Sequence, residues 1–201
     1  MNRSIYHIIA VLFLWVAISC SYPKKFTQTY YRENEKTLLS IRDRFKNLYD
    51  KNPFSLELMN KKISRINIEI HTDSVKYIYS FRMDEPFLLD TLHKYKFDVN
   101  AMSALIKDMQ KAHCTWITNL DYYEKMEKKY LVFISARDKK LNAFLRSERY
   151  FTLAFFDQPQ PYDEKGKLLD KEDLKRIRLI NDGVFRGIND KVSYALTGKY
   201  R

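Results

Sequence analysis

Residues 63–83 read ISRINIEIHTDSVKYIYSFRM and carry the clearest secondary-structure signal in the chain. Apolar or aromatic residues occupy every second position from 66 to 70 and again from 75 to 81, which is the period of a strand with one buried face. The intervening Thr72–Ser74 consists of typical turn residues. The stretch therefore predicts a β-hairpin whose polar face meets solvent.

Three segments around this hairpin have the spacing of amphipathic helices. Between residues 29 and 52, apolar side chains recur every three or four positions, and Pro53 stops the pattern. Asp84–Pro86 is a typical helix start, because proline fits the first helical turn. Asp98 starts a third helix that ends near His113. The sequence thus predicts one helix before the hairpin and two after it.

Residues 115–156 predict a meander of three further strands. Thr115–Leu120 is the first strand, Lys129–Ala136 is the second and Arg149–Phe156 is the third. The second and third strands are apolar on both faces, which indicates central strands covered by a packed layer.

The C-terminal segment has two interpretations. Gln158–Tyr162 is a loop of polyproline character, and Asp170 is a suitable cap for a long helix that follows it. Asn181–Gly183 alternatively forms a hairpin turn, which would break that helix. The helix is preferred because its spacing holds over many turns, and its apolar face comprises Leu174, Ile177, Ile180, Val184, Ile188, Val192 and Ala195.

The predicted elements follow the order α-ββ-αα-βββ-α. This order indicates an α+β fold, with an antiparallel sheet of about five strands, built from the hairpin and the meander, and helices packed on it. Residues 30–201 are long enough for a single α+β domain with a hydrophobic core and short for two domains.

Residues 1–19 have the pattern of an export signal. Arg3 is the only charged residue before Lys24, and every residue from Ile8 to Ile18 is apolar. This run is too short to cross a bilayer, which takes roughly 20 residues in a helix. A retained membrane helix or a buried core helix is disfavoured, because the run lies at the extreme N-terminus and is not amphipathic.

Ala17–Cys20, with the sequence AISC, resembles the lipobox of bacterial lipoproteins. The resemblance covers about the first 22 residues and none of the domain that follows. It implies cleavage between Ser19 and Cys20, with lipid attached to Cys20. Because Ser21 stands where aspartate tends to mean retention in the inner membrane, the resemblance also implies an outer-membrane protein that faces the periplasm.

Residues 20–29 form the expected lipidated cysteine and a short tether. Two or three acyl chains anchor a protein stably, whereas one chain binds only marginally. Lys24 and Lys25 follow the anchor closely, and anionic headgroups attract each such lysine by ~1 kcal/mol. The mature chain is therefore expected to stay at the cell envelope, with its domain close to the membrane.

The chain is strongly basic, with a formal net charge of +11. A basic balance usually raises nucleic acid as a partner, but export removes the protein from most nucleic acid. The charge is therefore read as a well-solvated surface, and no nucleic-acid partner is expected. The expected partners are the membrane and an envelope protein, and the oligomeric state stays open.

Reactive residues are sparse in the processed chain. If Cys20 carries lipid, Cys114 has no cysteine partner, so neither an intramolecular disulfide nor a cysteine-based metal cluster is expected. The side chains of His113 and Cys114 are expected to point apart, which favours a buried, inert thiol over a catalytic one. No histidine pair has the i, i+4 spacing of a zinc helix, the histidines being His71, His93 and His113.

Neither a glycine-rich phosphate loop nor a G-x-S-x-G or H-E-x-x-H motif is present. The acidic residues of the C-terminal segment lack calcium-loop spacing, and they fit a solvated loop and a helix N-terminus better: Asp157, Asp163, Glu164, Asp170, Glu172 and Asp173. Paired carboxylates for glycoside hydrolysis stay open, because such pairs meet in space. No metal, cofactor or catalytic residue is therefore expected.

Aromatic residues are abundant in the predicted strands and have two interpretations. They line a cavity or a partner-binding face, or they pack in the core, which is the usual role of aromatics in strands. The residues concerned are Tyr77, Tyr79, Phe81, Trp116, Tyr150, Phe151, Phe155 and Phe156.

Three functions are compatible with these features. The favoured one is a membrane-anchored envelope lipoprotein that binds protein as a subunit or accessory factor of a secretion or transport assembly, with residues 157–170 and the C-terminal helix as candidate contact surfaces. The second is an immunity-type lipoprotein that binds and neutralises a toxin, since a basic domain suits an acidic partner. The third is a periplasmic binder of a small ligand or lipid, or a hydrolase with a site that the sequence conceals.

Overall fold

The computed structural model describes residues 28–59, 64–124, 126–137, 150–167 and 185–197. The chain divides into two compact units, Met1–Glu35 and Lys36–Arg201. The second unit contains the sheet and most of the core. A helix covers residues 28–49, in agreement with the helix predicted over 29–52.

The predicted hairpin is confirmed. Strand β2 (Arg65–His71) pairs antiparallel with β3 (Lys76–Arg82). The turn is closed by Thr72 N, which donates to Val75 O at 2.9 Å. The isoleucines of β2 are buried and the polar residues between them are exposed or half-buried, as the alternation predicts.

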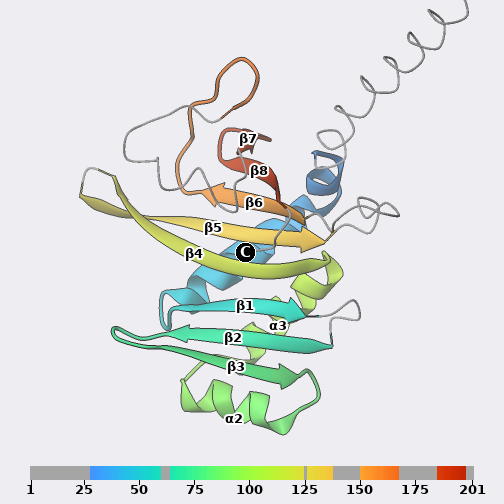
Figure 1. Ribbon diagram of the computed structural model, residues 1–201, viewed down its shortest axis with the longest axis vertical. Coiled ribbons are helices and arrows are strands. Elements are labelled where there is room, and N and C mark those ends of the chain that lie inside the picture. The colour runs from blue at the N-terminus through green and yellow to red at the C-terminus, as the bar shows by residue number, and fades with distance from the viewer. Residues whose placement is uncertain (1–27, 60–63, 125, 138–149, 168–184, 198–201) are drawn as a thin grey trace, which may run out of the picture. The chain divides into compact units, whose positions relative to one another are not determined.

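The α+β class is also confirmed, but the sheet has eight strands rather than about five. Its order is β3-β2-β1-β4-β5-β6-β8-β7, and every pairing is antiparallel (Figure 1). The remaining strands are β1 (Phe54–Met59), β4 (Cys114–Glu124), β5 (Glu127–Arg137), β6 (Tyr150–Phe156), β7 (Arg186–Gly187) and β8 (Val192–Thr197).

Strand β1 is absent from the predicted order. It starts directly after Pro53, the residue that ends the preceding helix in the sequence pattern. Phe54, Leu56 and Leu58 point to one face, and strand β1 pairs with β2 over its whole length. It pairs with β4 at only two positions, Leu56↔Ile117 and Glu57↔Trp116, so the two halves of the sheet meet at a short junction.

The predicted C-terminal helix is wrong from residue 185 onward, and its residues 168–184 lie outside the described residues. Residues 192–197 form β8, which pairs with β6 through partners such as Leu153↔Tyr194. The helix was predicted because the apolar residues at 188, 192 and 195 have helical spacing, but this stretch is too short for its spacing to exclude a strand. The neighbouring strand β6 overrides that local pattern, because β8 completes its backbone hydrogen bonds.

Helices cover one face of the sheet. They are residues 36–49 of the first helix, α2 (Pro86–Lys94) and α3 (Val99–Lys111), and the last two confirm the predicted pair. Phe54 of β1 anchors this layer, since its ring lies 4.9 Å from that of Phe45 and 5.2 Å from that of Phe97. Asp98 caps α3 by accepting a hydrogen bond from Ala101 N at 2.9 Å.

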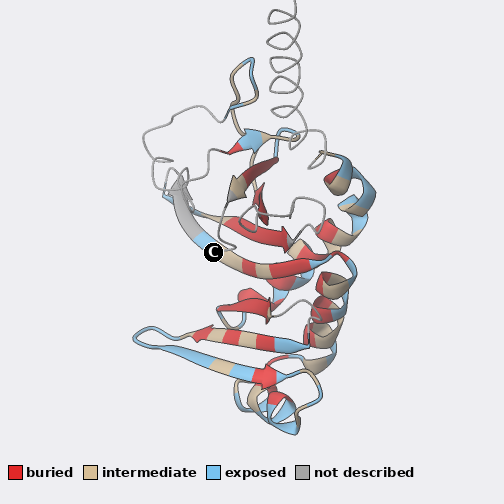
Figure 2. Cartoon of the chain, turned by 45° about the vertical axis from the view of Figure 1, so that its right-hand side comes forward, coloured by how far each residue is buried: buried red, intermediate tan, exposed pale blue. Residues whose placement is uncertain are grey.

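The opposite face differs from one half of the sheet to the other. Over β5, β6 and β8 it carries a second core, against which the partly buried Trp116 and Tyr162 pack. Figure 2 colours β6 as buried along its length. The buried members of this second core are Leu131, Phe133, Ala154, Phe156, Phe185 and Ala195. Over β2 and β3 the same face is polar and largely exposed. The predicted covering of the two central strands, β5 and β6, is thus confirmed.

Candidate functional site

The residues predicted to anchor the protein, Cys20, Lys24 and Lys25, lie outside the described residues. Within the part of the chain that the structure describes, no helix combines the length and apolar character that crossing a membrane requires.

The reactive side chains are dispersed. Cys114 is fully buried and its Sγ lies 3.9 Å from the carbonyl oxygen of Ala112, whereas His113 is exposed. The two side chains therefore point apart, as predicted. His71 lies on β2, where its Nε2 is 3.0 Å from Glu69 Oε1. Among the described residues, no three His, Cys, Asp or Glu side chains lie close enough to hold a metal ion.

Two acidic residues of the loop after β6, Asp157 and Asp163, have structural roles, whereas Glu164 is exposed. Asp157 Oδ1 accepts from Lys46 Nζ at 2.8 Å, and Asp157 Oδ2 accepts from Tyr130 N at 3.0 Å. Asp163 Oδ1 accepts from Lys167 N at 2.7 Å within the loop itself. The other predicted members of this group, Asp170, Glu172 and Asp173, lie outside the described residues.

The loop over residues 157–167 also covers the second core. The Tyr162 hydroxyl lies 2.7 Å from Ser193 Oγ, and its ring lies against Gly187, where a side chain would approach the ring to 3.1 Å. Burial raises the pKa of Tyr162, and the charge of Asp190 adds to this, although the hydrogen bond with Ser193 opposes it. The apolar part of this candidate contact surface is thus already used inside the domain.

Most of the aromatic residues singled out in the strands pack in the core. Phe151 and Phe155 are buried on the helix-covered face, and Phe156 belongs to the second core. Tyr77 differs, because 42% of its surface is exposed. The core interpretation therefore holds for β6 and fails at one position of β3.

One carboxylate is buried on the open face of the sheet. Glu57 is 5% exposed, and its Oε2 accepts a hydrogen bond from Asn67 Nδ2 at 3.3 Å. The pairing register places it between Asn67 and Trp116. This geometry makes Glu57 a cross-strand tie between β1 and β2.

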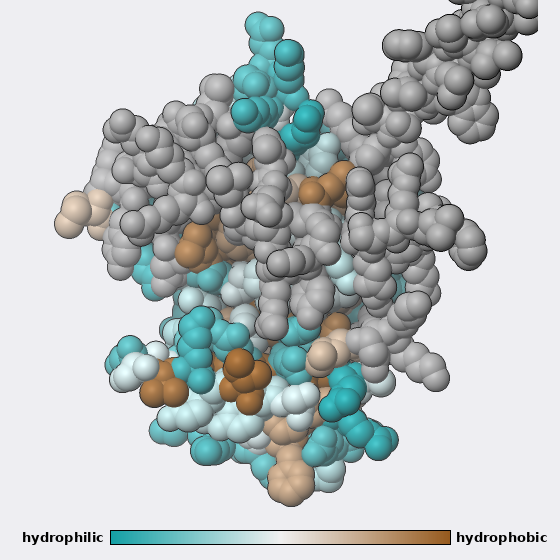
Figure 3. Space-filling model, viewed as in Figure 1, coloured by the Kyte–Doolittle hydropathy of each residue, from teal (hydrophilic) through white to brown (hydrophobic). Residues whose placement is uncertain are grey.

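Exposed apolar side chains gather on one segment of the described chain. Seven large hydrophobic side chains are exposed among the described residues, and five of these seven lie between residues 75 and 89. Figure 3 shows hydrophobic side chains among hydrophilic ones in this region, near β3 and α2. The five are Val75, Tyr77, Ile78, Phe87 and Leu89. Such surfaces are typical of contact sites, since soluble monomers expose few contiguous apolar patches.

A groove lies between α2 and α3, with a volume of about 430 Å³, and we name it the α2–α3 groove. Its apolar lining includes Leu88, Leu89 and Leu92 from α2 and Ile106 from α3. Leu89, which is 48% exposed, lies at its rim, and Lys107 is the cation of its lining. The α2–α3 groove is thus open, apolar in its walls and charged at its edges.

A tight connection holds the two helices of the α2–α3 groove together. Lys96 has a left-handed backbone with φ of 56°, and its N donates to His93 O at 2.9 Å. Phe97 N donates to Leu92 O at 2.9 Å, and the Phe97 side chain is buried. This pattern satisfies the last carbonyls of α2 and turns the chain directly into α3.

Two tyrosines attach the end of α2 to β3. The hydroxyl groups of Tyr79 and Tyr95 lie 2.7 Å apart, and their ring centroids are 5.8 Å apart. The hydrogen bond with Tyr79, followed by burial and the nearby Tyr77, raises the pKa of Tyr95 to about 12. The pair therefore positions the end of α2 on β3.

The acidic mouth of the α2–α3 groove is partly neutralised within the chain. Arg82 donates to both carboxylate oxygens of Asp84, at 3.1 and 2.9 Å, and this hydrogen bonding lowers the pKa of Asp84. Arg82 N also donates to Glu85 Oε2 at 3.0 Å. Lys107 is exposed and has no recorded ion pair among the described residues, which leaves a cationic edge for a partner.

The sequence contains a signal for this site that the periodicity alone misses. Phe87, Leu88 and Leu89 are three consecutive apolar residues on a short helix, and a helix cannot bury all of them on one face. Ile78 is likewise the one apolar residue on the polar face of the predicted hairpin.

Comparison with known proteins gives no relative: no protein-family model, no curated protein and no solved structure matches this chain.

Proposed function

We propose that this protein is a membrane-anchored envelope lipoprotein that acts as a protein-binding subunit or accessory factor of a secretion or transport assembly. In this proposal Cys20 carries the lipid, and Lys24 and Lys25 seat the tether on anionic headgroups, with the domain facing the periplasm from the outer membrane. The first 22 residues support the anchor by their resemblance to lipoprotein signals.

The α2–α3 groove is the single observation that carries protein binding. Its open form and the exposed Phe87 and Leu89 beside it suit the apolar side chains of a protein segment. The occupant is an amphipathic helix of an envelope protein, with apolar residues in the α2–α3 groove and a carboxylate beside Lys107. A carboxylate of the partner suits this position because Lys107 is a cation. Asp84, an acidic residue of the same lining, is already paired with Arg82 and does not compete for Lys107.

The test is a pull-down of the tagged, lipidated protein from detergent-solubilised envelopes. Leu89→Glu places a charge at the rim of the α2–α3 groove, and Leu120→Glu makes the same change on β4, where the leucine is 38% exposed. We expect Leu89→Glu to lose a stoichiometric envelope partner that Leu120→Glu retains. Thermal melts of all variants control for folding.

A Cys20→Ala variant separates the anchor from the α2–α3 groove. Loss of membrane association with retained binding of the partner in solution is expected, because the lipid seats the domain and the groove makes the contact. Equal capture by Leu89→Glu and the unmodified chain would contradict the role of the α2–α3 groove. Full membrane association of Cys20→Ala would contradict the anchor.

A further inference from the structure

Strand β3 ends the eight-stranded sheet, so one of its edges has no neighbouring strand among the described residues. The hydrogen bonds Thr72 N to Val75 O and Met83 N to Ser64 O fix where β2 and β3 exchange hydrogen bonds. In an antiparallel pair such positions alternate along each strand. Their alternation directs the backbone N–H and C=O groups of Lys76, Ile78 and Ser80 away from β2.

Arg82 confirms this assignment, because it is the next alternating position after Lys76, Ile78 and Ser80. Its backbone N–H donates to Glu85 Oε2 at 3.0 Å rather than to β2. Strand β3 thus presents outward-directed donors and acceptors at 76, 78 and 80, in the geometry that a further strand requires.

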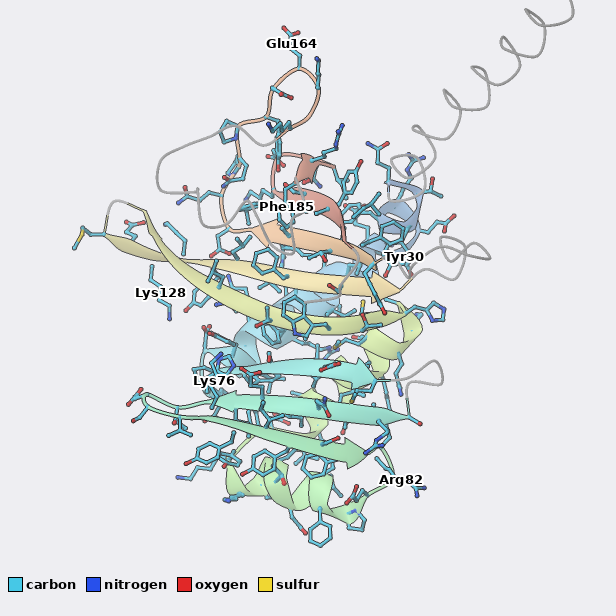
Figure 4. The ribbon with its side chains drawn as sticks, in the orientation of Figure 1. Tyr30, Lys76, Arg82, Lys128, Glu164 and Phe185 are labelled. Atoms are coloured by element: carbon cyan, nitrogen blue, oxygen red, sulfur yellow. The ribbon has the colours of Figure 1, made fainter. Side chains whose placement is uncertain are left out.

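The usual protections of an edge strand are weak at the centre of β3. Natural edges carry proline, a bulge or a charge that faces a would-be neighbour. The centre of β3 is Tyr77-Ile78-Tyr79, and Ile78 is 68% exposed. Figure 4 labels Lys76 and Arg82 at the two ends of the strand, and these cations are paired within the chain.

Helix α2 lies next to β3 at this end of the sheet (Figure 1) and contacts it on the helix-covered face. Tyr79 points to that face, because it is the register partner of the buried Ile68, and its hydroxyl contacts Tyr95. The side chains of Lys76, Ile78 and Ser80 point to the other face and are exposed. The exposed apolar edge therefore lies beside α2 without belonging to the α2–α3 groove.

We propose that two copies of this protein associate through β3, antiparallel and centred on Ile78, so that two eight-stranded sheets become one. In this register Ile78 lies opposite Ile78 of the second copy, and the exposed side chain becomes buried. Lys76 lies opposite Ser80 of the second copy, which avoids a pair of like charges. Tyr77 lies opposite Tyr79 of the second copy on the other face.

Two other registers fit less well. Centring on Lys76 sets two lysines opposite each other, and centring on Tyr79 sets Lys76 opposite Arg82 of the second copy. Like charges directly opposite each other destabilise a strand pair. Only the register centred on Ile78 pairs the most exposed apolar residue of β3 with itself.

A cysteine cross-link tests both the pairing and its register. Residues opposite each other at a hydrogen-bonded position have Cα atoms about 5.5 Å apart, which suits a disulfide. We expect the full-length Ile78→Cys protein in detergent to form a covalent dimer under mild oxidation. Ser80→Cys is the matched control, since it is exposed on the same face but lies opposite Lys76 of the second copy. The chain without a substitution is the second control, since any covalent dimer that it forms must arise from its own cysteines, such as Cys20.

Sedimentation equilibrium provides the second measurement. The unmodified chain is expected to dimerise, and its dissociation constant is expected to fall as salt rises, because each copy has a net charge of +11. Ile78→Lys is expected to be monomeric and to unfold at the temperature of the unmodified chain diluted to the monomer, because the side chain it replaces is exposed in one copy. Leu89→Glu is expected to dimerise normally, which separates this proposal from the α2–α3 groove.

A monomeric unmodified chain at all accessible concentrations would overturn the proposal. Equal cross-linking of Ile78→Cys and Ser80→Cys would overturn the register. Dimerisation of Ile78→Lys at the strength of the unmodified chain would overturn the use of this edge.

Discussion

The two halves of the sheet show how differently one architecture treats its two faces. Strands β5, β6 and β8 are buried on both faces, whereas β2 and β3 are covered on one face only. Phe133 and Ile78 point to the same face of the sheet, yet Phe133 is 1% exposed and Ile78 is 68% exposed. The half with β5, β6 and β8 has a core on both of its faces, whereas the half with β2 and β3 keeps one face available for contacts.

The largest expected effect breaks the two-sided half. Phe133→Ala removes a buried ring whose centroid lies 6.0 Å from that of Phe185, and this should lower the free energy of unfolding by about 3 to 5 kcal/mol. Ile78→Ala, the matched change in the one-sided half, should stay within about 0.5 kcal/mol. Denaturant unfolding measures both, and equal losses would show that the halves do not differ in this way.

The next effect concerns the link between the first helix and the two-sided half. Asp157→Ala removes the acceptor of both Lys46 Nζ and Tyr130 N, and we expect a loss of about 1 to 2 kcal/mol. The Arg82–Asp84 pair is exposed, so Asp84→Ala should cost less than about 0.5 kcal/mol. Chemical denaturation of the two variants checks the order, and a larger loss for Asp84→Ala would reverse it.

A smaller effect is expected in the helices that cover the sheet. Asp98→Ala removes the side-chain acceptor at the N-terminus of α3 and should destabilise the protein by about 1 kcal/mol. Asp90→Ala replaces an exposed aspartate within α2 and should change the stability by less than about 0.5 kcal/mol. Thermal unfolding of both variants sharpens the comparison, and an unchanged Asp98→Ala would show that the cap contributes nothing.

The smallest effect is confined to alkaline pH in the one-sided half. Because the pKa of Tyr95 is raised to about 12, the folded state holds a proton that the unfolded state loses near pH 10. The resulting stability is complete below pH 10 and disappears as the pH rises towards 12. Tyrosinate absorbance should show late-titrating groups, one of which Tyr79→Phe shifts to lower pH, and an unaltered titration would contradict this role of Tyr79.

Local patterns predict the elements whose neighbours are close in sequence. The hairpin, α2 and α3 carry their own turn residues, caps and periodicity, so their positions follow from residues 63–113 alone. Strand β8 could not be assigned in this way, because its partner β6 lies in another part of the chain, whereas β1 was missed although its partner β2 is the next strand. The segment around Val192 satisfies two periods at once, and only pairing with β6 selects the strand.

The candidate site was less predictable than the fold. The contact surface predicted over residues 157–170 stays a prediction, while Tyr162 of that segment packs on the second core. The α2–α3 groove depends on the left-handed Lys96 and the buried Phe97, which set how α3 meets α2. The sequence shows that Leu89 does not lie on the buried face of α2 and that Ile78 does not lie on the buried face of β3. It does not show which surface each of these side chains adjoins.

The short junction between β1 and β4 has a consequence for the way the native state opens. Only two register pairs join the halves, whereas ten join β4 to β5 and seven join β2 to β3. Phe45 contacts Phe54 on one side of the junction, and Lys46 pairs with Asp157 on the other. Sub-global opening should therefore begin at this junction, so that the amides of β2 exchange with solvent deuterium before those of β5.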